Sequence, residues 1–192
     1  MTETGLRERG KARRRAAITR AAYGLFAERG YDATTVADIA EAAEVSPRTI
    51  AMYFPAKQDI AMSRVSDAVA GLTAAIQSRP PGVSVTDALG RWLRAAQTEP
   101  EDLEQRMLAR RMFAANPQLA ALRTARLAAA MRGGAAVIAA DTNSEPSAIG
   151  PRLAAAAASA MIAEVLDTEP GAAREEAIAA SMRFIRAGIA AL

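Results

Sequence analysis

Residues 46–54 carry the side chains whose chemistry is easiest to interpret. Ser46 followed by Pro47 is typical of a helix start, because a serine hydroxyl caps the first turn and proline needs no backbone N–H there. The helix must be short, since Pro55 disfavours helical geometry at the residue before it. Arg48 is the long hydrogen-bond donor on this helix, and arginine paired with guanine is the commonest specific contact to a DNA base. The segment therefore predicts a short helix able to read base edges.

Other kinds of chemistry are excluded by what the sequence lacks. The 192 residues include no histidine and no cysteine, which rules out Cys/His zinc sites, disulfides and His-based catalytic triads. The acidic residues are scattered over polar faces without a convergent pair. We therefore expect no enzyme activity, no catalytic residue, no bound metal and no cofactor.

The positive charge is concentrated at the start of the chain. The net charge of the whole chain is +3, yet residues 1–20 hold seven basic and two acidic residues. A basic arm on a nearly neutral body is typical of a contact to the DNA backbone, for which Arg13 and Arg14 are candidates. A solvated, disordered tail is the alternative interpretation.

Three helices are predicted around this segment. Apolar residues at helical spacing, among them Ile18, Ala22 and Phe26, predict an amphipathic helix over residues 12–29, which Gly30 ends. Thr35 and Asp38 have the spacing of a capping box, so a second helix should run to about residue 43. The short helix of residues 46–54 is the third.

The second and third helices have the pattern of a helix-turn-helix motif. Ala40 is the small residue required where the two helices cross, and Ile39, Val45 and Ile50 are placed to fix the angle between them. Phe54 can close the same core from below. In such a motif the second helix enters the major groove of DNA. An ordinary helical hairpin shares most of this pattern and is the alternative.

The rest of the chain also has the pattern of helices. Periodicity and the Pro, Gly and Asn breaks predict helices over residues 57–79, 84–98, 100–115, 117–140, 146–167 and 171–191, with a bend at 133–134 allowed. No uninterrupted apolar run approaches the ~20 residues of a membrane span, and the N-terminus is charged. We therefore expect a cytoplasmic protein without membrane contact.

The stretch AAYGLFAERGYDATTVADIAEAAEVSPRTIAMYFPAKQDI, residues 21–60, resembles the N-terminal domain of the TetR family of bacterial regulators, most of all its actinobacterial members. The blocks LFAERGYDATTV, DIAEAA, VSPRTI and YFPAKQD occur in the family's order and spacing. The remainder resembles the family only in being helical, Ala-rich and of suitable length. The resemblance implies a homodimeric transcriptional repressor that binds a palindromic operator on double-stranded DNA.

The resemblance also implies roles for single residues. Thr35, Tyr53 and Lys57 match phosphate contacts, although Tyr53 is alternatively a core aromatic. Ala51 and Met52 replace the polar or aromatic residues common on the base-facing surface, and Glu44 replaces the usual glycine of the turn. The predicted DNA-binding residues are Arg13, Arg14, Thr34, Thr35, Ser46, Pro47, Arg48, Thr49, Met52, Tyr53 and Lys57.

The last two helices are rich in small residues, which allows close helix packing. In the family such helices form the dimer interface, for which the candidates are Ala158, Ile162, Leu166, Met182, Ile185 and Ile189; a hairpin core within one chain is the alternative. The middle helices should hold any effector pocket, because methionines suit an adaptable apolar cavity. Candidate pocket residues are Trp92, Met107, Arg111, Met112, Phe113, Leu127 and Met131, although such residues are more often plain core.

The sequence thus predicts an all-α protein of about nine helices. Residues 1–56 form the arm and the helix-turn-helix DNA-binding domain, and residues 57–192 form a helical effector-binding and dimerisation domain. The expected effector is a small apolar or acyl-type molecule that releases the repressor from its operator. The alternative is a DNA-binding protein of the same fold without a small-molecule effector.

Overall fold

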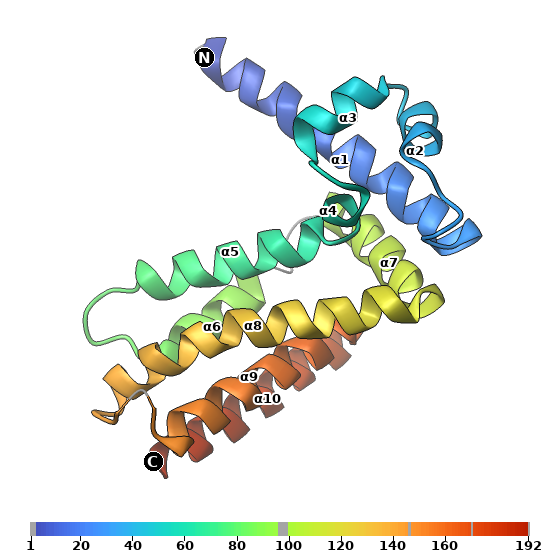
Figure 1. Cartoon of the computed structure of the whole chain (residues 1–192). Coiled ribbons are helices and arrows are strands. Elements are labelled where there is room, and N and C mark those ends of the chain that lie inside the picture. The colour runs from blue at the N-terminus through green and yellow to red at the C-terminus, as the bar shows by residue number, and fades with distance from the viewer. Residues whose placement is uncertain (1–2, 96–99, 146, 170, 192) are drawn as a thin grey trace. The chain divides into compact units, whose positions relative to one another are not determined.

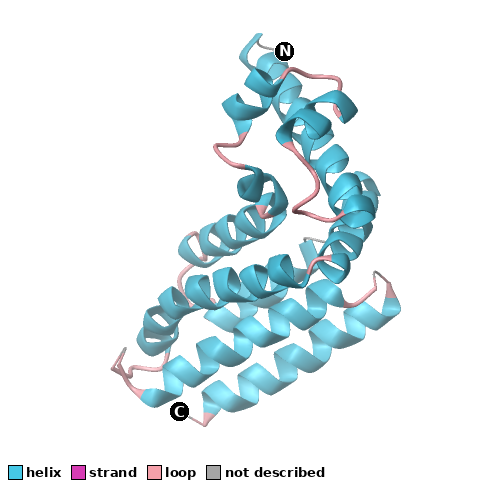
Figure 2. Ribbon diagram, turned by 45° about the vertical axis from the view of Figure 1, so that its right-hand side comes forward, coloured by secondary structure: helices cyan, strands magenta, loops and turns pink. Residues whose placement is uncertain are grey.

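The computed structural model describes residues 3–95, 100–145, 147–169 and 171–191. The elements in these ranges are ten α-helices, so the predicted all-α class is confirmed (Figures 1 and 2). They form two compact units: unit 1 contains residues 1–64 and 101–121, and unit 2 contains residues 65–100 and 122–192. This division differs from the sequence-based boundary after residue 56, because part of the middle of the chain packs with the N-terminal helices.

Unit 1 is built around the first helix. Its elements are α1 (Glu3–Arg29), α2 (Val36–Ala42), α3 (Pro47–Tyr53), α4 (Lys57–Ala61) and most of α7 (Pro100–Ala115). The apolar stripe of α1 is buried as predicted, with Ile18 and Phe26 fully inaccessible to solvent. Ile39 of α2 and Ile50 of α3 are buried in the same unit. Burial of side chains of this size contributes roughly 1.5–3 kcal/mol each to folding.

The first helix begins earlier than the sequence predicts. It starts at Glu3 rather than near residue 12, so the basic segment is the N-terminal half of α1 and not a separate arm or tail. Arg, Lys, Glu and Ala are good helix formers and can extend a helix through this segment. Gly10 opposes them by only about 1 kcal/mol relative to alanine, a cost that the good helix formers on both sides of it can offset.

The helix predicted over residues 57–79 is two helices, which accounts for the tenth element. α4 ends at Ala61 and α5 begins at Ser63 (Ser63–Gln77). Met62 between them is fully buried. The buried hydroxyl of Tyr23 lies 3.1 Å from the hydroxyl of Ser63. This hydrogen bond joins α1 to the break between α4 and α5, a long-range contact that helical periodicity does not encode.

Asn116 holds the junction of α7 and α8 against the end of α1. Its side-chain amide donates to the backbone carbonyls of Phe26 and Met112, both at 2.8 Å. Its oxygen accepts the backbone N–H of Tyr31 at 2.7 Å. Only 2% of Asn116 is exposed, so these hydrogen bonds are made out of contact with water. One side chain therefore satisfies three backbone groups from two distant parts of the chain.

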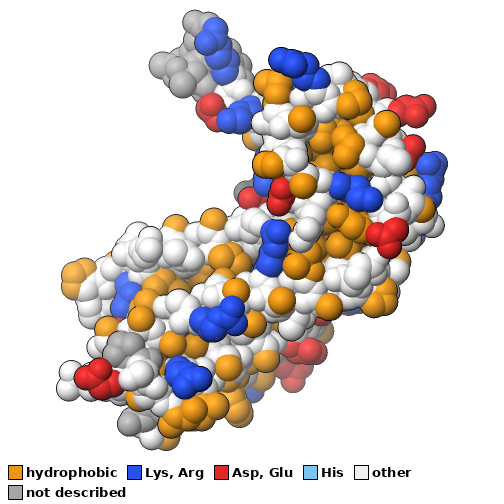
Figure 3. All heavy atoms as spheres, viewed as in Figure 1, with side chains coloured by type: hydrophobic (Ala, Val, Ile, Leu, Met, Phe, Trp, Pro, Cys, Tyr) orange, Lys and Arg blue, Asp and Glu red, His pale blue; other side chains and the backbone are white. Residues whose placement is uncertain are grey.

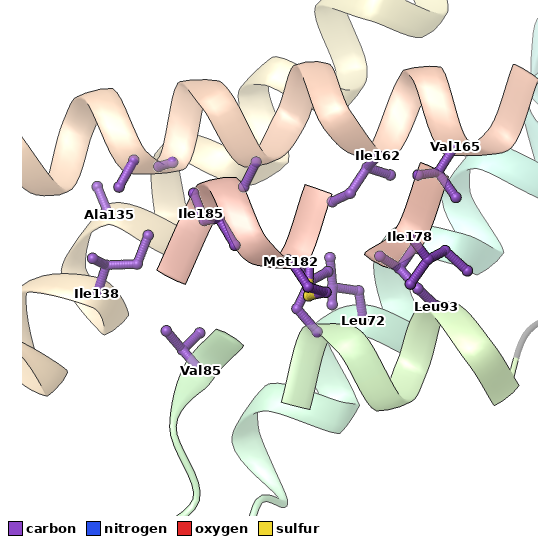
Figure 4. Packing of buried hydrophobic residues seen from close by; sticks show 14 residues of the cluster. Leu72, Val85, Leu93, Ala135, Ile138, Ile162, Val165, Ile178, Met182 and Ile185 are labelled. Atoms are coloured by element: carbon purple, nitrogen blue, oxygen red, sulfur yellow. The ribbon is translucent and has the colours of Figure 1, made fainter. Parts of the chain in front are cut away.

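Unit 2 has a separate apolar core. It contains most of α5, α6 (Val85–Ala95), most of α8 (Pro117–Asp141), α9 (Ile149–Asp167) and α10 (Ala172–Ala190). α8 is continuous through Gly133 and Gly134. α9 and α10 lie side by side, and α10 also contacts α6. Figure 4 shows side chains from all five helices meeting in this core, which includes Leu72, Val85, Leu93, Ile138, Ile162, Ile178 and Met182.

Four of the predicted dimer-interface residues belong to this core. Ala158 and Ile162 of α9, and Met182 and Ile185 of α10, are each at most 6% exposed within a single chain. They pack against α5, α6 and α8 and are not available to a second copy, so the alternative of a core within one chain is correct for them. The two remaining candidates are half-buried and pack against the same core: Leu166 and Ile189.

One described helix, α9, is long and apolar enough to cross a membrane, with 19 residues and a mean hydropathy of 1.4. This was not expected from the sequence. A single helix that meets these two criteria is weak evidence, because core helices meet them as well. α9 buries Ile162 and Val165 in the core of unit 2, which is the behaviour of a core helix.

Replacement of Asn116 by alanine should destabilise the protein. The Tyr31 N–H and the Phe26 carbonyl would lose their buried partner, and each such loss costs about 1–3 kcal/mol. We expect the free energy of unfolding, measured with urea, to fall by about 2–4 kcal/mol. Gln118→Ala, at an exposed position two residues further on, is the control. Equal midpoints for the two variants would contradict the role given to Asn116.

Candidate nucleic-acid interface

At the turn between α2 and α3, a residue with left-handed backbone geometry ends α2. The Val45 N–H donates to the Ala40 carbonyl at 2.9 Å, and the Glu44 N–H donates to the Glu41 carbonyl at 3.0 Å. These two hydrogen bonds define a Schellman motif. Glu44 has a φ of 54°, in the region that glycine adopts without cost. The turn expected of a helix-turn-helix motif is therefore present, with a glutamate at the position that favours glycine.

The start of α3 is capped as its sequence predicts. The Ser46 hydroxyl accepts the Thr49 N–H at 3.0 Å and lies 2.8 Å from the Thr49 hydroxyl. Pro47 occupies the first turn, where its missing N–H leaves nothing unsatisfied. The N-terminal end of the helix, which a helix-turn-helix motif directs towards the bases, is therefore rigidly defined.

α3 has one buried and one exposed face. Ile50 and Phe54 are buried. Pro47, Arg48, Ala51 and Met52 are exposed, and Met52 is 77% exposed. Since residues three and four positions apart share one face of a helix, burial of the Ile50 and Phe54 pair turns Arg48 and Met52 outward. This exposed set contains the residues predicted to face the bases except Thr49, which is half-buried.

A complete capping box fixes the start of α2. The Asp38 carboxylate accepts the Thr35 N–H and the Thr35 hydroxyl, both at 2.7 Å, and the Thr35 hydroxyl accepts the Asp38 N–H at 3.1 Å. The hydrogen bonds from the Thr35 hydroxyl and backbone lower the pKa of Asp38. The carboxylate therefore favours the folded state at neutral pH, and this contribution is lost as the pH falls through the lowered pKa.

Two residues predicted to bind DNA have structural roles in the loop before α2. Thr34 is only 1% exposed, and its hydroxyl donates to the Gly30 carbonyl at 2.8 Å; its assignment to DNA binding is therefore wrong. The Lys57 ammonium donates to the carbonyls of Tyr31 and Thr34 at 2.7 and 2.8 Å, and it lies 4.2 Å from the centre of the Tyr31 ring. Because an ammonium has three N–H groups, these contacts leave Lys57 limited capacity for a phosphate.

The N-terminal half of α1 contacts α3 through two arginines. The Arg14 guanidinium lies 3.5 Å from the Tyr53 hydroxyl. The Arg15 guanidinium lies over the Phe54 ring, 5.2 Å from its centre, a favourable cation–π arrangement. Tyr53 is half-buried with its hydroxyl towards Arg14. Tyr53 was predicted either to contact phosphate or to be a core aromatic. Its position is compatible with both, because the ring packs on the protein and the hydroxyl lies at the surface.

A groove of about 500 Å³ lies between α1 and α3. It is lined by Arg7, Gly10, Lys11, Arg14, Met52 and Tyr53. Figure 3 shows Lys and Arg side chains on the N-terminal half of α1. Sequence reasoning did not identify Arg7 and Lys11 as site residues, although the spacing of positions 7, 11 and 14 would place them on one helix face once the helix is extended to residue 3.

The predicted effector-pocket residues fall in both units. In unit 1, Met112 and Phe113 are buried, whereas Met107 is 55% exposed and Arg111 is exposed. Two candidates belong to unit 2, one buried and one half-buried against its core: Leu127 and Trp92, respectively. The side chain of the remaining candidate, Met131, lies outside the described residues.

Comparison with known sequences gives a family that matches part of the chain and one similar protein. A family described as "Bacterial regulatory proteins, tetR family" matches residues 18–62, which contain α2, α3 and α4. The chain is also 40% identical over 91 residues to the HTH-type transcriptional regulator TcmR of Streptomyces glaucescens. This match covers 47% of the chain and 40% of TcmR, so the similarity spans less than half of that relative.

Solved structures resemble the chain over nearly its whole length. Salmonella enterica GusR superposes with a TM-score of 0.62 at 24% identity, covering 93% of this chain and 94% of GusR. PfmR, a TetR family transcriptional regulator from Thermus thermophilus, superposes with a TM-score of 0.53 at 23% identity, covering 88% and 97%. At this identity the likeness is one of fold, and it extends through both units.

Replacement of Glu44 by glycine should stabilise the protein. A residue with a side chain costs about 1–2 kcal/mol in the left-handed region, and part of this gain is offset because glycine has more freedom when unfolded. We expect the free energy of unfolding to rise by about 1 kcal/mol, measured by denaturant titration. Glu41→Gly, inside α2 and also exposed, should lower it by a similar amount. A lower stability for Glu44→Gly would contradict the turn geometry.

Proposed function

Because the chain belongs to the TetR family of bacterial regulatory proteins, we propose that it is a transcriptional regulator that binds DNA by placing α3 in the major groove. The observation that carries this proposal is the exposed face of α3, where Arg48 and Met52 face solvent on a helix capped at Ser46. Arginine can pair with guanine through two hydrogen bonds, and Met52 offers apolar contact to a thymine methyl group.

We propose that the chain binds DNA as a homodimer on a palindromic operator. A single α3 of seven residues can reach only a few base pairs, which gives little selectivity. Two-fold symmetric dimers place two such helices about 34–36 Å apart, one turn of DNA. Each half-site would then be read by one copy of Arg48, with backbone contacts from Ser46, Thr49 and Tyr53 at the edges of α3.

We place the dimer surface on the outward faces of α9 and α10, because their inward faces are occupied by the core. Ile149 and Leu153 of α9 are 64% and 61% exposed, and Phe184 of α10 is 65% exposed. Leu153 and Phe184 lie at similar distances from the connection between the two antiparallel helices. Small neighbours at Ala156 and Ala160 would allow a second copy to approach closely.

We propose further that the chain represses transcription by occupying a promoter, and that a small apolar or acyl-type effector bound to the helices outside the helix-turn-helix motif releases it. The separate core of unit 2 is compatible with a second, ligand-responsive function. A thermal-shift screen of metabolites tests this part: a compound that raises the melting temperature and weakens DNA binding supports it. A broad panel without such a compound favours a DNA-binding protein without an effector.

The proposal contains no catalytic step, in agreement with the family, whose members are non-enzymatic regulators. The sequence-based expectation that the chain is not an enzyme agrees with this assignment. A regulator of this kind acts where bacterial DNA is, so we propose that the chain works in the cytoplasm.

Arg48→Ala should weaken specific DNA binding and relax one base position in each half-site. Loss of a bidentate base contact costs about 1–3 kcal/mol per site, which is measurable by fluorescence anisotropy on the duplex that the full chain selects from a random library. Arg132→Ala, which removes one exposed arginine of α8, is the control. An equal loss of affinity on scrambled DNA would make Arg48 a phosphate contact and contradict base reading.

Leu153→Glu should split the dimer without unfolding the chain, because Leu153 is exposed and a buried, unpaired carboxylate would oppose the proposed interface. We expect the mass measured by light scattering at micromolar concentration to fall from that of a dimer to that of a monomer. Leu103→Glu, at the 42% exposed Leu103 of α7, should leave the mass unchanged. A dimer that persists in Leu153→Glu would refute this surface.

A further inference from the structure

The cations of α1 are divided between different faces of the helix. Residues four and seven positions apart share a face of a helix, so Arg7, Lys11 and Arg14 lie on one side, and these three line the groove against α3. Arg9 and Arg13 are also four positions apart and lie roughly opposite. Arg13 and Arg14, the two residues of α1 predicted to contact DNA, therefore lie on different faces. Of these two, only Arg14 lines the groove.

The groove combines positive charge with room for a bulky group. Arg7, Lys11 and Arg14 are exposed at its cationic wall. The opposite wall is formed by Met52 and Tyr53 of α3. Its surface therefore offers cationic donors for phosphate oxygens directly beside the face of α3 that would contact the bases.

Gly10 contributes space to the same groove. A Cβ atom added at Gly10 would meet no other atom within 4 Å, so the fold itself does not require glycine there. Glycine inside a helix costs about 0.5–1 kcal/mol relative to alanine. A ligand that approaches the backbone of α1 closely would account for a glycine that the protein's own packing does not explain.

We propose that this groove binds one strand of the sugar–phosphate backbone of the DNA that α3 reads, so that the N-terminal half of α1 and α3 hold the backbone between them. The inference rests on the proposed function. The position of the groove supports this proposal. Since α3 forms one of its walls, a DNA strand in the groove would lie directly beside the bases that α3 contacts. Arg7, Lys11 and Arg14 would neutralise phosphates, whereas Arg9 and Arg13 would remain towards solvent.

Two charge-matched double variants test the proposal in the full-length chain. Arg7→Gln with Lys11→Gln removes two charges from the groove, and Arg9→Gln with Arg13→Gln removes two from the other face at the same spacing. The probe is the duplex that the wild-type chain selects from a random library, with affinity measured between about 50 and 200 mM salt. Each neutralised phosphate contributes about 0.9 to the slope of log affinity against log salt.

We expect the groove variant to reduce the magnitude of this slope by about two and the control variant to leave it nearly unchanged. Over this fourfold salt range the wild type would lose about 12-fold more affinity than the groove variant. Gly10→Leu, which fills the groove without removing charge, should also lose affinity while its melting temperature does not fall.

The outcomes separate the two claims. Equal slope changes in both double variants would mean that only net charge matters, and this would overturn the assignment of the groove to DNA. An unchanged slope in both variants, with a wild type that binds, would overturn it too. Undiminished affinity of Gly10→Leu would overturn it as well. If the wild type enriches no duplex at all, the proposed function itself is wrong, and the groove assignment falls with it.

Discussion

The burial of Ile50 and Phe54 determines which side of α3 is available to a ligand. Because they pack with Ile39 and Ala40 of α2, α3 has only one orientation in which Ile50 and Phe54 are removed from water. Burial at this scale is worth several kcal/mol, far more than the cost of exposing Met52. The outward position of Arg48 is therefore a consequence of packing on the opposite face of the same helix.

Local signals made the geometry of α2, α3 and the turn between them predictable. Caps, prolines and a left-handed turn act within a few residues, so the bounds of α2 and α3, the buried Ile39 and Ile50, and the unfavourable conformation of Glu44 followed from the sequence. The predicted all-α class follows from composition and periodicity in the same way. In these cases the residues that fix the geometry are neighbours in the chain.

The errors concern contacts between distant residues. Periodicity showed that α9 and α10 carry apolar seams, but it could not tell whether Ile162 and Met182 meet their own core or a second copy; the structure places them in the core. Lys57 matches the position of a phosphate contact in the family, and Thr34 is among the residues predicted to bind DNA. The polar atoms of both side chains instead donate to backbone carbonyls. The role of Asn116 depends on hydrogen bonds to Phe26 and Tyr31, which lie far away in the sequence.

Cations near the motif thus serve different purposes. Lys57 holds the loop before α2, Arg15 lies over Phe54, and Arg48 points away from the protein. Total positive charge therefore does not distinguish the cations that the fold uses from those directed to solvent, whereas the face of the helix on which each cation lies does.

Selection of bound sequences from a random duplex library by the wild-type chain tests the central claim most directly. The account predicts an enriched motif with two inverted half-sites, their centres about 10 base pairs or a multiple of that distance apart. Enrichment of no motif, or of a single half-site without an inverted copy, would contradict the paired presentation of α3 to DNA.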